Sequence, residues 1–306
     1  MRIAILGATS QIAKDLIHSI SMLSDMRLHL FARRPHEVSK WLDAQGLIAR
    51  HAVLEISDFG GQEFDAVINF VGAGDPARIA EAGYSIFDTT LHFDDKVLKY
   101  LDAHPACRYI FMSSGAAYGS DFSVPARHDS AAIVPINQLA PRDWYGVAKL
   151  HAECRHRAHQ DLCIFDIRVF NYFSRTQDLN ARFLITDMLR AIREKSVLMT
   201  SSEYMVRDYL HPSDFYNLVS ALLLAPKMNT AVDCYSCAPI DKPQLLFAMQ
   251  ERFGLRYEII DVPAGVDATG SKPHYYSLNM KAADFGYLPK FTSLEGVLQE
   301  SAYVLS

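Results

Sequence analysis

Short apolar runs alternate with segments of helical periodicity over roughly the first 170 residues of the chain. The runs RIAILGA and DAVINFVGA are apolar almost throughout and contain glycine at or near their ends, whereas SQIAKDLIHSISML spaces Ile12, Leu16, Ile17 and Ile20 as one face of a helix. Continuously apolar strands joined by helices predict a parallel sheet that is covered on both faces. We therefore expect a doubly wound α/β fold, which binds its ligands at the carboxyl ends of the strands.

The pattern changes after about residue 171. ARFLITDMLRAIREK and KPQLLFAMQERFG are helical, with short strands and loops between and after them. We expect a doubly wound parallel Rossmann sheet with a smaller mixed α/β cap over its carboxyl edge. The expected dinucleotide-binding domain comprises residues 1–170, rejoined by about 207–237, and the expected substrate-binding cap comprises residues 171–206 and 238–306.

Charge and cysteine content limit the class of partner. The net charge of −5 provides no basic field for nucleic acid, and the apolar start is too short for a signal peptide or a membrane span. Five cysteines without an export signal are typical of reduced thiols, so we expect a cytoplasmic protein. Cys234 and Cys237 form a C-x-x-C, but no second ligand pair has matching spacing, and we expect no metal.

The first strand ends at Gly7 in the turn GATSQIA. A dinucleotide-binding turn needs small residues there, because the backbone approaches a pyrophosphate and the helix packs close to the strand. Gly7, Ser10 and Ala13 stand where three glycines would make the strongest motif, so an ordinary strand–turn–helix remains an alternative. The cofactor contacts that we assign to this turn are Gly7, Thr9, Ser10, Gln11 and Ile12.

The second strand ends in FARRP, with Arg33 and Arg34 and no acidic residue expected nearby. A free ribose 2′-hydroxyl usually meets an Asp or Glu at this place, whereas an arginine fork suits a 2′-phosphate. We therefore favour NADP(H) as the cofactor, with NAD(H) as the alternative. The two arginines could also be a solvent-exposed pair with no role in binding. The remaining cofactor contacts that we assign are Glu55, Ile56, Phe70, Val71, Gly72, Tyr145 and Lys149.

The runs MSSGAAYG and YGVAK contain residues suited to carbonyl chemistry. Reduction of a carbonyl needs a proton donor, and the hydroxyl of Tyr145 can serve if its high reference pKa is lowered. Lys149 follows at i+4 on the same face of a helix, where its charge favours the phenolate. Ser113 and Ser114 end the preceding strand and can bind the same substrate oxygen. Tyr-x-x-x-Lys alone is weak evidence, and its value comes from following this strand and a dinucleotide turn.

Together these blocks resemble the extended short-chain dehydrogenases/reductases of the nucleotide-sugar epimerase/dehydratase/reductase family. The resemblance covers GATSQIA, INFVGAG, SSGAAYG, YGVAK, RVFNYF, RDYLHPSDF and LNMKAADFGYLP, nearly the whole chain. It implies that Ser114 is the catalytic serine, Tyr145 the acid/base, and Lys149 its partner, which also holds the nicotinamide ribose.

Departures from the family motifs favour one reaction. Similar dehydratases carry an Asp–Glu pair after the catalytic hydroxyl, where this chain has Gly115 and Ala116, and enzymes that epimerise two carbons carry a cysteine in this loop, where Ala117 and its neighbours offer none. We favour NADPH-dependent reduction of a 4-keto group on a nucleoside-diphosphate-linked (6-deoxy)hexose, with Tyr145 as proton donor. An NAD-dependent nucleotide-sugar 4-epimerase is the alternative, and a non-catalytic dinucleotide-binding regulatory protein is the alternative of another class.

The resemblance also implies substrate contacts and a homodimer. It assigns Asn171 and Arg207 to the diphosphate, and Lys272 is the charged residue best placed to serve before the KA block; Ser114 is the fourth substrate contact. In relatives the helix near 88–104 and the helix HAECRHRAHQ form a dimer interface. We expect His151, His156 and His159 to lie on a solvated or interface face of that second helix.

Overall fold

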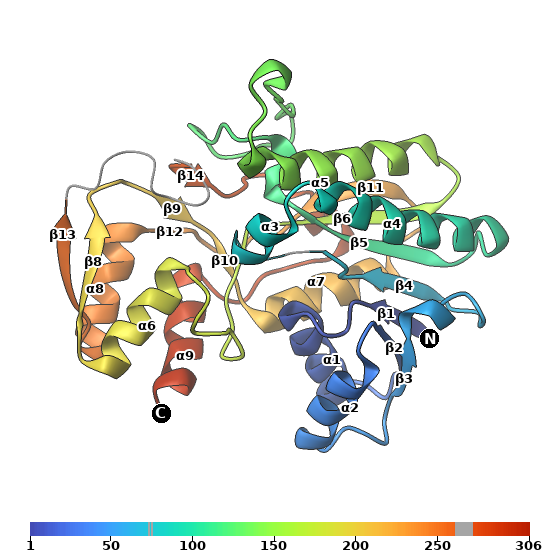
Figure 1. Ribbon diagram of the computed structural model, residues 1–306, viewed down its shortest axis with the longest axis horizontal. Coiled ribbons are helices and arrows are strands. Elements are labelled where there is room, and N and C mark those ends of the chain that lie inside the picture. Colours follow the sequence, from blue (N-terminus) through green and yellow to red (C-terminus); the bar gives the residue numbers. More distant parts are fainter. Residues whose placement is uncertain (73, 75, 261–271) are drawn as a thin grey trace.

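The computed structural model describes residues 1–72, 74, 76–260 and 272–306 (Figure 1). The helices within this part are α1 Gln11–Leu23, α2 Pro35–Ala44, α3 Pro76–Ala82, α4 Ser85–Ala103, α5 Pro141–Ala158, α6 Leu184–Glu194, α7 Pro212–Leu224, α8 Lys242–Phe253 and α9 Ser293–Leu305. The strands are β1 Ile3–Leu6, β2 Leu28–Ala32, β3 Ala52–Glu55, β4 Ala66–Asn69, β5 Arg108–Ser114, β6 Cys163–Val169, β7 Asn171–Tyr172, β8 Val197–Ser201, β9 Val206–Arg207, β10 Tyr209–Leu210, β11 Asn229–Asp233, β12 Ile240–Asp241, β13 Arg256–Ile260 and β14 His274–Tyr275. Single-turn helices include η1 Ile56–Asp58, η2 Gly115–Tyr118, η3 Ile136–Gln138 and η4 Lys281–Phe285.

Seven parallel strands form the central sheet, in the order β11-β6-β5-β4-β1-β2-β3. The chain moves outward from β1 through β2 to β3, then returns to the other side of β1 and continues through β4, β5 and β6. This order confirms the expected doubly wound α/β fold. The reversal between β1 and β4 opens a crevice at their carboxyl ends, which is the usual ligand site of such sheets.

Alternate side chains of each strand belong to the two faces of the sheet. Ile3 and Ile5 of β1 pack in one core with helices α1, α2 and α7. Ala4 and Leu6 pack in a second core on the other face, together with Val97 of α4. Figure 1 shows α4 and α5 on one side of the sheet and α1, α2 and α7 on the other. Both faces are buried, which is why the strands are apolar without alternation.

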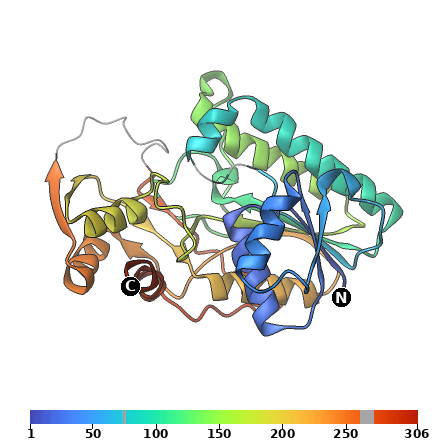
Figure 2. The same cartoon turned by 60° about the horizontal axis from the view of Figure 1, so that its bottom comes forward.

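The cap has a separate core, to which α6, α8 and α9 contribute Met188, Leu246 and Val297. Figure 2 shows these three helices gathered beside the central sheet. Strand β11 lies in the central sheet, whereas β9, β12 and β14 form a small sheet of their own. The division into two domains at the bounds given above stays a prediction. None of the helices in the described ranges is both long and apolar enough to cross a membrane.

Candidate active site

Strand β5 and helix α5 bring the three expected catalytic residues together. Ser114 is the last residue of β5 and begins the turn η2, where its Oγ accepts a hydrogen bond of 3.2 Å from the backbone N–H of Ala116. Tyr145 and Lys149 lie in the first half of α5, which packs directly on this turn. A Cβ on Gly146 would stand 2.5 Å from the Ala116 carbonyl oxygen, so glycine next to Tyr145 permits this approach.

The Tyr145 phenol lies near enough to Ser114 for the serine hydroxyl to affect its pKa. Burial raises this pKa above the ordinary value of a tyrosine, and the serine hydroxyl lowers it by a smaller amount. The net direction is the opposite of the one we expected from the spacing of Tyr145 and Lys149. The physical reason is that the phenol lies in a desolvated place, where its ionised form is disfavoured before a substrate enters.

Lys149 is buried between the tyrosine and the crevice. Its Nζ donates a hydrogen bond of 2.7 Å to the Met112 carbonyl oxygen and lies 5.8 Å from the centre of the Tyr145 ring. The same Nζ is 3.6 Å from the place that a Cβ on Gly72 would take, beyond the end of β4. Burial lowers the Lys149 pKa to about 8, against the opposing effect of three carboxylates, those of Asp94, Glu153 and Asp166.

A second tyrosine, which the sequence analysis did not identify, reaches the same serine. Tyr275 of β14 places its Oη 3.3 Å from Ser114 Oγ, and burial raises its pKa well above the ordinary value. No motif contains this residue, and an isolated aromatic residue in HYYS carries no signal of its own. Ser114 therefore has a phenol on two sides, one from α5 and one from the cap.

The turn after β1 has the shape that a pyrophosphate needs. Gly7 has φ +77°, and a Cβ there would stand 2.9 Å from backbone atoms of Phe70 and Val71. Ser10 caps α1 by accepting a hydrogen bond from Ala13 N–H, and Gln11 donates to Ser174 Oγ at 2.7 Å. Close approach of β1 and β4 at a glycine, with a helix N-terminus in front, fits a nicotinamide dinucleotide.

The other expected cofactor residues lie along the same edge. Thr9 and Ile12 flank Ser10 and Gln11, and Phe70 and Val71 follow β4 directly. Glu55 is the last residue of β3, and Ile56 begins the turn η1. The cofactor contacts assigned to these residues stay predictions.

The arginines after β2 are exposed, but they are not without an acidic neighbour. Arg34 Nη1 forms an ion pair of 2.8 Å with Glu37, one turn into α2. The sequence analysis expected no acidic residue near Arg33 and Arg34, but the first turn of α2 places the Glu37 carboxylate beside Arg34. The pair is solvent-exposed, so the carboxylate competes only weakly with a phosphate for the guanidinium.

The expected substrate residues meet on the cap side of the serine. Asn171 Nδ2 donates to the Tyr275 carbonyl oxygen at 3.2 Å, and Arg207 Nη1 donates to the Lys272 carbonyl oxygen at 2.7 Å. Lys272 Nζ lies 4.9 Å from the centre of the Tyr275 ring. Burial and then Arg207 lower the Lys272 pKa to about 8. These contacts gather four polar side chains beside Ser114.

A small pocket, with a volume of about 30 Å³, opens to solvent beside the start of α5. Its lining includes Ala116 and Ala117 from the serine turn, Arg142 and Gly146 from α5, and Lys272 from the cap. The pocket therefore begins at the turn that follows Ser114, and its charged lining residues are Arg142, Asp143 and Lys272.

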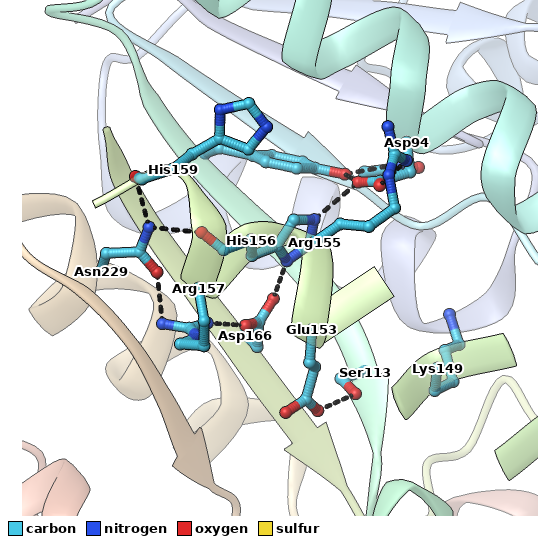
Figure 3. A network of polar contacts seen from close by, with 12 residues as sticks. Asp94, Ser113, Lys149, Glu153, Arg155, His156, Arg157, His159, Asp166 and Asn229 are labelled. Atoms are coloured by element: carbon cyan, nitrogen blue, oxygen red, sulfur yellow. Dashed lines mark hydrogen bonds and ion pairs between the residues drawn. The ribbon is translucent and has the colours of Figure 1, made fainter. Parts of the chain in front are cut away.

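One expectation for α5 was wrong. His156 is not on a solvated or interface face but completely buried, and both ring nitrogens contact carboxylates, Nδ1 that of Asp166 at 2.6 Å and Nε2 that of Asp94 at 2.7 Å (Figure 3). Asp166 lies in β6 and Asp94 in α4, so the sequence of α5 alone could not reveal either partner. Within the described ranges, no group of three or more His, Cys, Asp and Glu side chains has the arrangement of a metal site.

Comparisons with known proteins identify the family of the chain. A model of the NAD dependent epimerase/dehydratase family matches residues 3–238. The chain is 32% identical over 135 residues to UDP-glucose 4-epimerase 4 of Oryza sativa subsp. japonica, covering 39% of this chain and 33% of that protein. It is 30% identical over 123 residues to UDP-glucose 4-epimerase 2 of the same plant, covering 37% and 27%. The chain thus spans about a third or less of the length of these curated relatives.

Solved structures share the fold over the whole chain. A mutant UDP-glucuronic acid 4-epimerase from Bacillus cereus, in complex with UDP-4-deoxy-4-fluoro-glucuronic acid and NAD, superposes with a TM-score of 0.81 at 16% identity, covering 99% of both chains. A UDP-glucose 4-epimerase from Stenotrophomonas maltophila, with bound NAD and formylated UDP-arabinopyranose, gives 0.81 at 14% identity, covering 100% of this chain and 98% of the other. At such low identity the likeness shows the fold alone.

Proposed function

The chain belongs to the NAD dependent epimerase/dehydratase family, and we propose that it exchanges hydride and a proton at C4 of a hexose linked to a nucleoside diphosphate. The observation that carries the proposal is the meeting of Ser114, Tyr145 and Lys149 at the carboxyl edge of the sheet, beside the glycine turn of β1. A non-catalytic dinucleotide-binding protein has no need of all three.

Each of the three residues has a distinct part in the reaction. Tyr145 donates a proton to the sugar oxygen as that oxygen gains negative charge, and Ser114 donates a hydrogen bond to the same oxygen. Lys149 stabilises the phenolate that remains, because its ammonium group lies on the face of the Tyr145 ring and is mostly protonated near neutral pH. A bound nicotinamide supplies or accepts the hydride. The same three side chains can serve both reduction of the ketone and oxidation of the alcohol.

The direction that we propose is reduction of a 4-keto sugar with NADPH. Arg33 and Arg34 support it, since both are exposed at the end of β2 and either guanidinium can reach out to a 2′-phosphate. Ser114 is followed by Gly115 and Ala116, whose side chains cannot donate or accept a proton, and this argues against elimination of water from the sugar. The family resemblance implies that dehydratases carry an Asp–Glu pair at these two positions.

A second candidate is an NAD-dependent 4-epimerase, and a specific observation favours it. The two curated relatives are named UDP-glucose 4-epimerases, and the two solved structures described above hold NAD. Tyr145 would then accept the proton of the C4 hydroxyl and later return it, while bound NAD would supply the chemistry of accepting hydride from C4 and giving it back on the other face, without net use of cofactor.

For the rest of the substrate we propose that Asn171, Arg207 and Lys272 hold the diphosphate and the sugar. The guanidinium of Arg207 and the ammonium group of Lys272 supply positive charge for phosphate oxygens. We also propose a homodimer that pairs α4 and α5 of two copies.

One experiment separates the two candidates. The purified protein is incubated with UDP-glucose alone, and separately with NADPH and a panel of nucleotide-linked 4-keto-6-deoxyhexoses, and the products are identified by NMR. Consumption of NADPH with formation of a 6-deoxyhexose supports the reductase. Formation of UDP-galactose without added cofactor supports the epimerase, and no change in any mixture would contradict both.

A further inference from the structure

Glu153 lies behind the catalytic residues on the same helix. It follows Lys149 at i+4 in α5 and is only 4% exposed, and its carboxylate points toward Ser113 (Figure 3). Its Oε1 accepts a hydrogen bond of 2.5 Å from the hydroxyl of Ser113, the residue directly before Ser114. Helix α5 is thereby attached to the end of the strand that carries the catalytic serine.

Arg168 completes this attachment from the neighbouring strand. It lies opposite Ser113 in the register of β5 and β6, and its Nε and Nη2 donate to both oxygens of Glu153, the shortest contact being 2.5 Å. Its Nη1 donates at 2.7 Å to the hydroxyl of Tyr118, the last residue of the turn η2. Ser114 is therefore held on both sides, through Ser113 before it and Tyr118 after it.

The same network reaches the cap. The Tyr118 hydroxyl donates to Oδ2 of Asp233 in β11 at 2.9 Å, and Ser277 Oγ donates to the same oxygen at 2.6 Å. Ser277 lies two residues after Tyr275, whose phenol contacts Ser114. One continuous set of buried hydrogen bonds therefore joins helix, sheet and cap around the serine.

Glu153 is also one of the charges that act on Lys149. The groups that raise the Lys149 pKa are Asp94 of α4, Glu153 of α5 and Asp166 of β6, while burial lowers it. Asp94 and Asp166 share the cationic His156 between them, and Glu153 has Arg168. Glu153 is the carboxylate among these three that also holds the catalytic strand, so charge and position are combined in one side chain.

We propose that Glu153, held by Arg168, is a positioning residue of this site: it fixes Ser114 against α5 and places a carboxylate one helical turn from Lys149. This inference rests on the proposed function for its catalytic consequence, but the effect on Lys149 exists whether or not the protein turns over a sugar. A residue of purely structural importance would affect folding and activity without changing the titration of Lys149.

The test uses the full chain labelled with [13C]lysine, in which the Lys149 Cε signal is identified by its absence from Lys149→Met. The wild type is expected to titrate near pH 8. Glu153→Gln keeps the size of the side chain but removes its charge, and the midpoint is expected to fall by about one pH unit. Turnover at pH 8.5 is then expected to fall by roughly eightfold, since that is the change in the protonated fraction for a shift of about one unit.

Ser113→Ala is the matched control for geometry. It removes the hydrogen bond to Glu153 and leaves the charge, so the Lys149 midpoint is expected to stay within about 0.2 of the wild type while kcat falls severalfold at every pH. Glu153→Asp, which keeps the charge but shortens the reach, is expected to behave like Ser113→Ala. If Glu153→Gln does not fold, the kcat of Glu153→Asp still tests whether the position of the carboxylate matters.

Two results would overturn the inference: a Lys149 midpoint that is the same in Glu153→Gln and wild type, or a kcat of Glu153→Asp equal to that of wild type. A wild-type protein that is inactive with every sugar nucleotide refutes the proposed function, but the NMR midpoints still decide the charge effect of Glu153.

Discussion

Ser114 Oγ lies 3.3 Å from the Oη atom of Tyr275, while the same serine lowers the pKa of the Tyr145 phenol against the larger, raising effect of burial. The two phenols reach it from different parts of the chain, Tyr145 from α5 and Tyr275 from β14, which pairs with β9 of the cap. A residue of the cap therefore touches the residue that we place at the reacting oxygen. The sugar oxygen has to enter between these hydroxyls, so the two tyrosines are open to separate tests.

Tyr275→Phe is expected to lower kcat by less than about tenfold and to change KM, because Ser114 keeps its place beside Tyr145 when the second phenol is removed. Steady-state kinetics with the active sugar nucleotide measures both constants. A loss of kcat as large as that of Tyr145→Phe would show that Tyr275 donates the proton instead.

Arg34→Ala is expected to weaken NADPH binding by about tenfold and leave NADH binding unchanged, because a charged hydrogen bond to the 2′-phosphate is lost. Glu37→Gln is expected to act in the opposite direction, since it releases Arg34 from its ion pair. Fluorescence titration with both cofactors measures the affinities, with Arg33→Ala alongside. Equal affinity of the wild type for NADPH and NADH would contradict the argument from Arg33 and Arg34.

Gly7→Ala is expected to abolish cofactor binding and to destabilise the fold, because the new Cβ would meet the backbone of Phe70 at a φ of +77°. Gly46→Ala is the matched control: its φ is +68°, but nothing lies within 4 Å of the added Cβ. The control is expected to lose only about 1–2 kcal/mol of stability from backbone strain. Thermal melts with and without cofactor compare them, and Gly7→Ala with normal binding would contradict the placement of the pyrophosphate.

Deprotonation of His156 is expected to lower the free energy of unfolding as the pH becomes alkaline. Burial alone lowers its pKa, but Asp166 and Asp94 raise it to about 9, above the 6.5 of a free histidine. The folded state thus binds the proton more tightly, so this contribution is complete below about pH 6.5 and is lost as the pH rises through 9. Its size is on the order of 3 kcal/mol.

Urea unfolding between pH 6 and 10 measures this contribution. His156→Gln is expected to be less stable than wild type at pH 6, with the difference shrinking toward pH 10. His151→Gln, an exposed change on the same helix, is expected to follow the wild type throughout. Parallel pH curves for His156→Gln and wild type would contradict a charged imidazole at this place.

Local patterns were sufficient to predict the central sheet and the approach of Ser114 to the helix that carries Tyr145 and Lys149. Apolar runs such as Ile3–Leu6 have few alternatives to a buried parallel strand, and the spacing of Tyr145 and Lys149 on one helix follows from helical geometry alone. Ser114 could be placed because it ends the strand next to this helix. In each case the signal lies within one element or between successive elements.

The missed features depend on residues far apart in sequence. His156 is charged because Asp94 and Asp166 lie on other elements, and Tyr275 reaches Ser114 across 161 positions. The raised pKa of Tyr145 results from burial, which spacing does not reveal. Glu153 is different: its place at i+4 from Lys149 was visible in the sequence, but its role depends on Ser113 and Arg168, which only the register of β5 and β6 brings to it.

The central claim is that the Tyr145 hydroxyl donates the proton to the sugar oxygen. Turnover of Tyr145→Phe, measured with saturating cofactor and the substrate identified for the wild type, tests it most directly. We predict that kcat falls by about 10²–10⁴-fold while cofactor affinity and melting temperature stay at the wild-type values. A variant that turns over the sugar as fast as the wild type would contradict the claim.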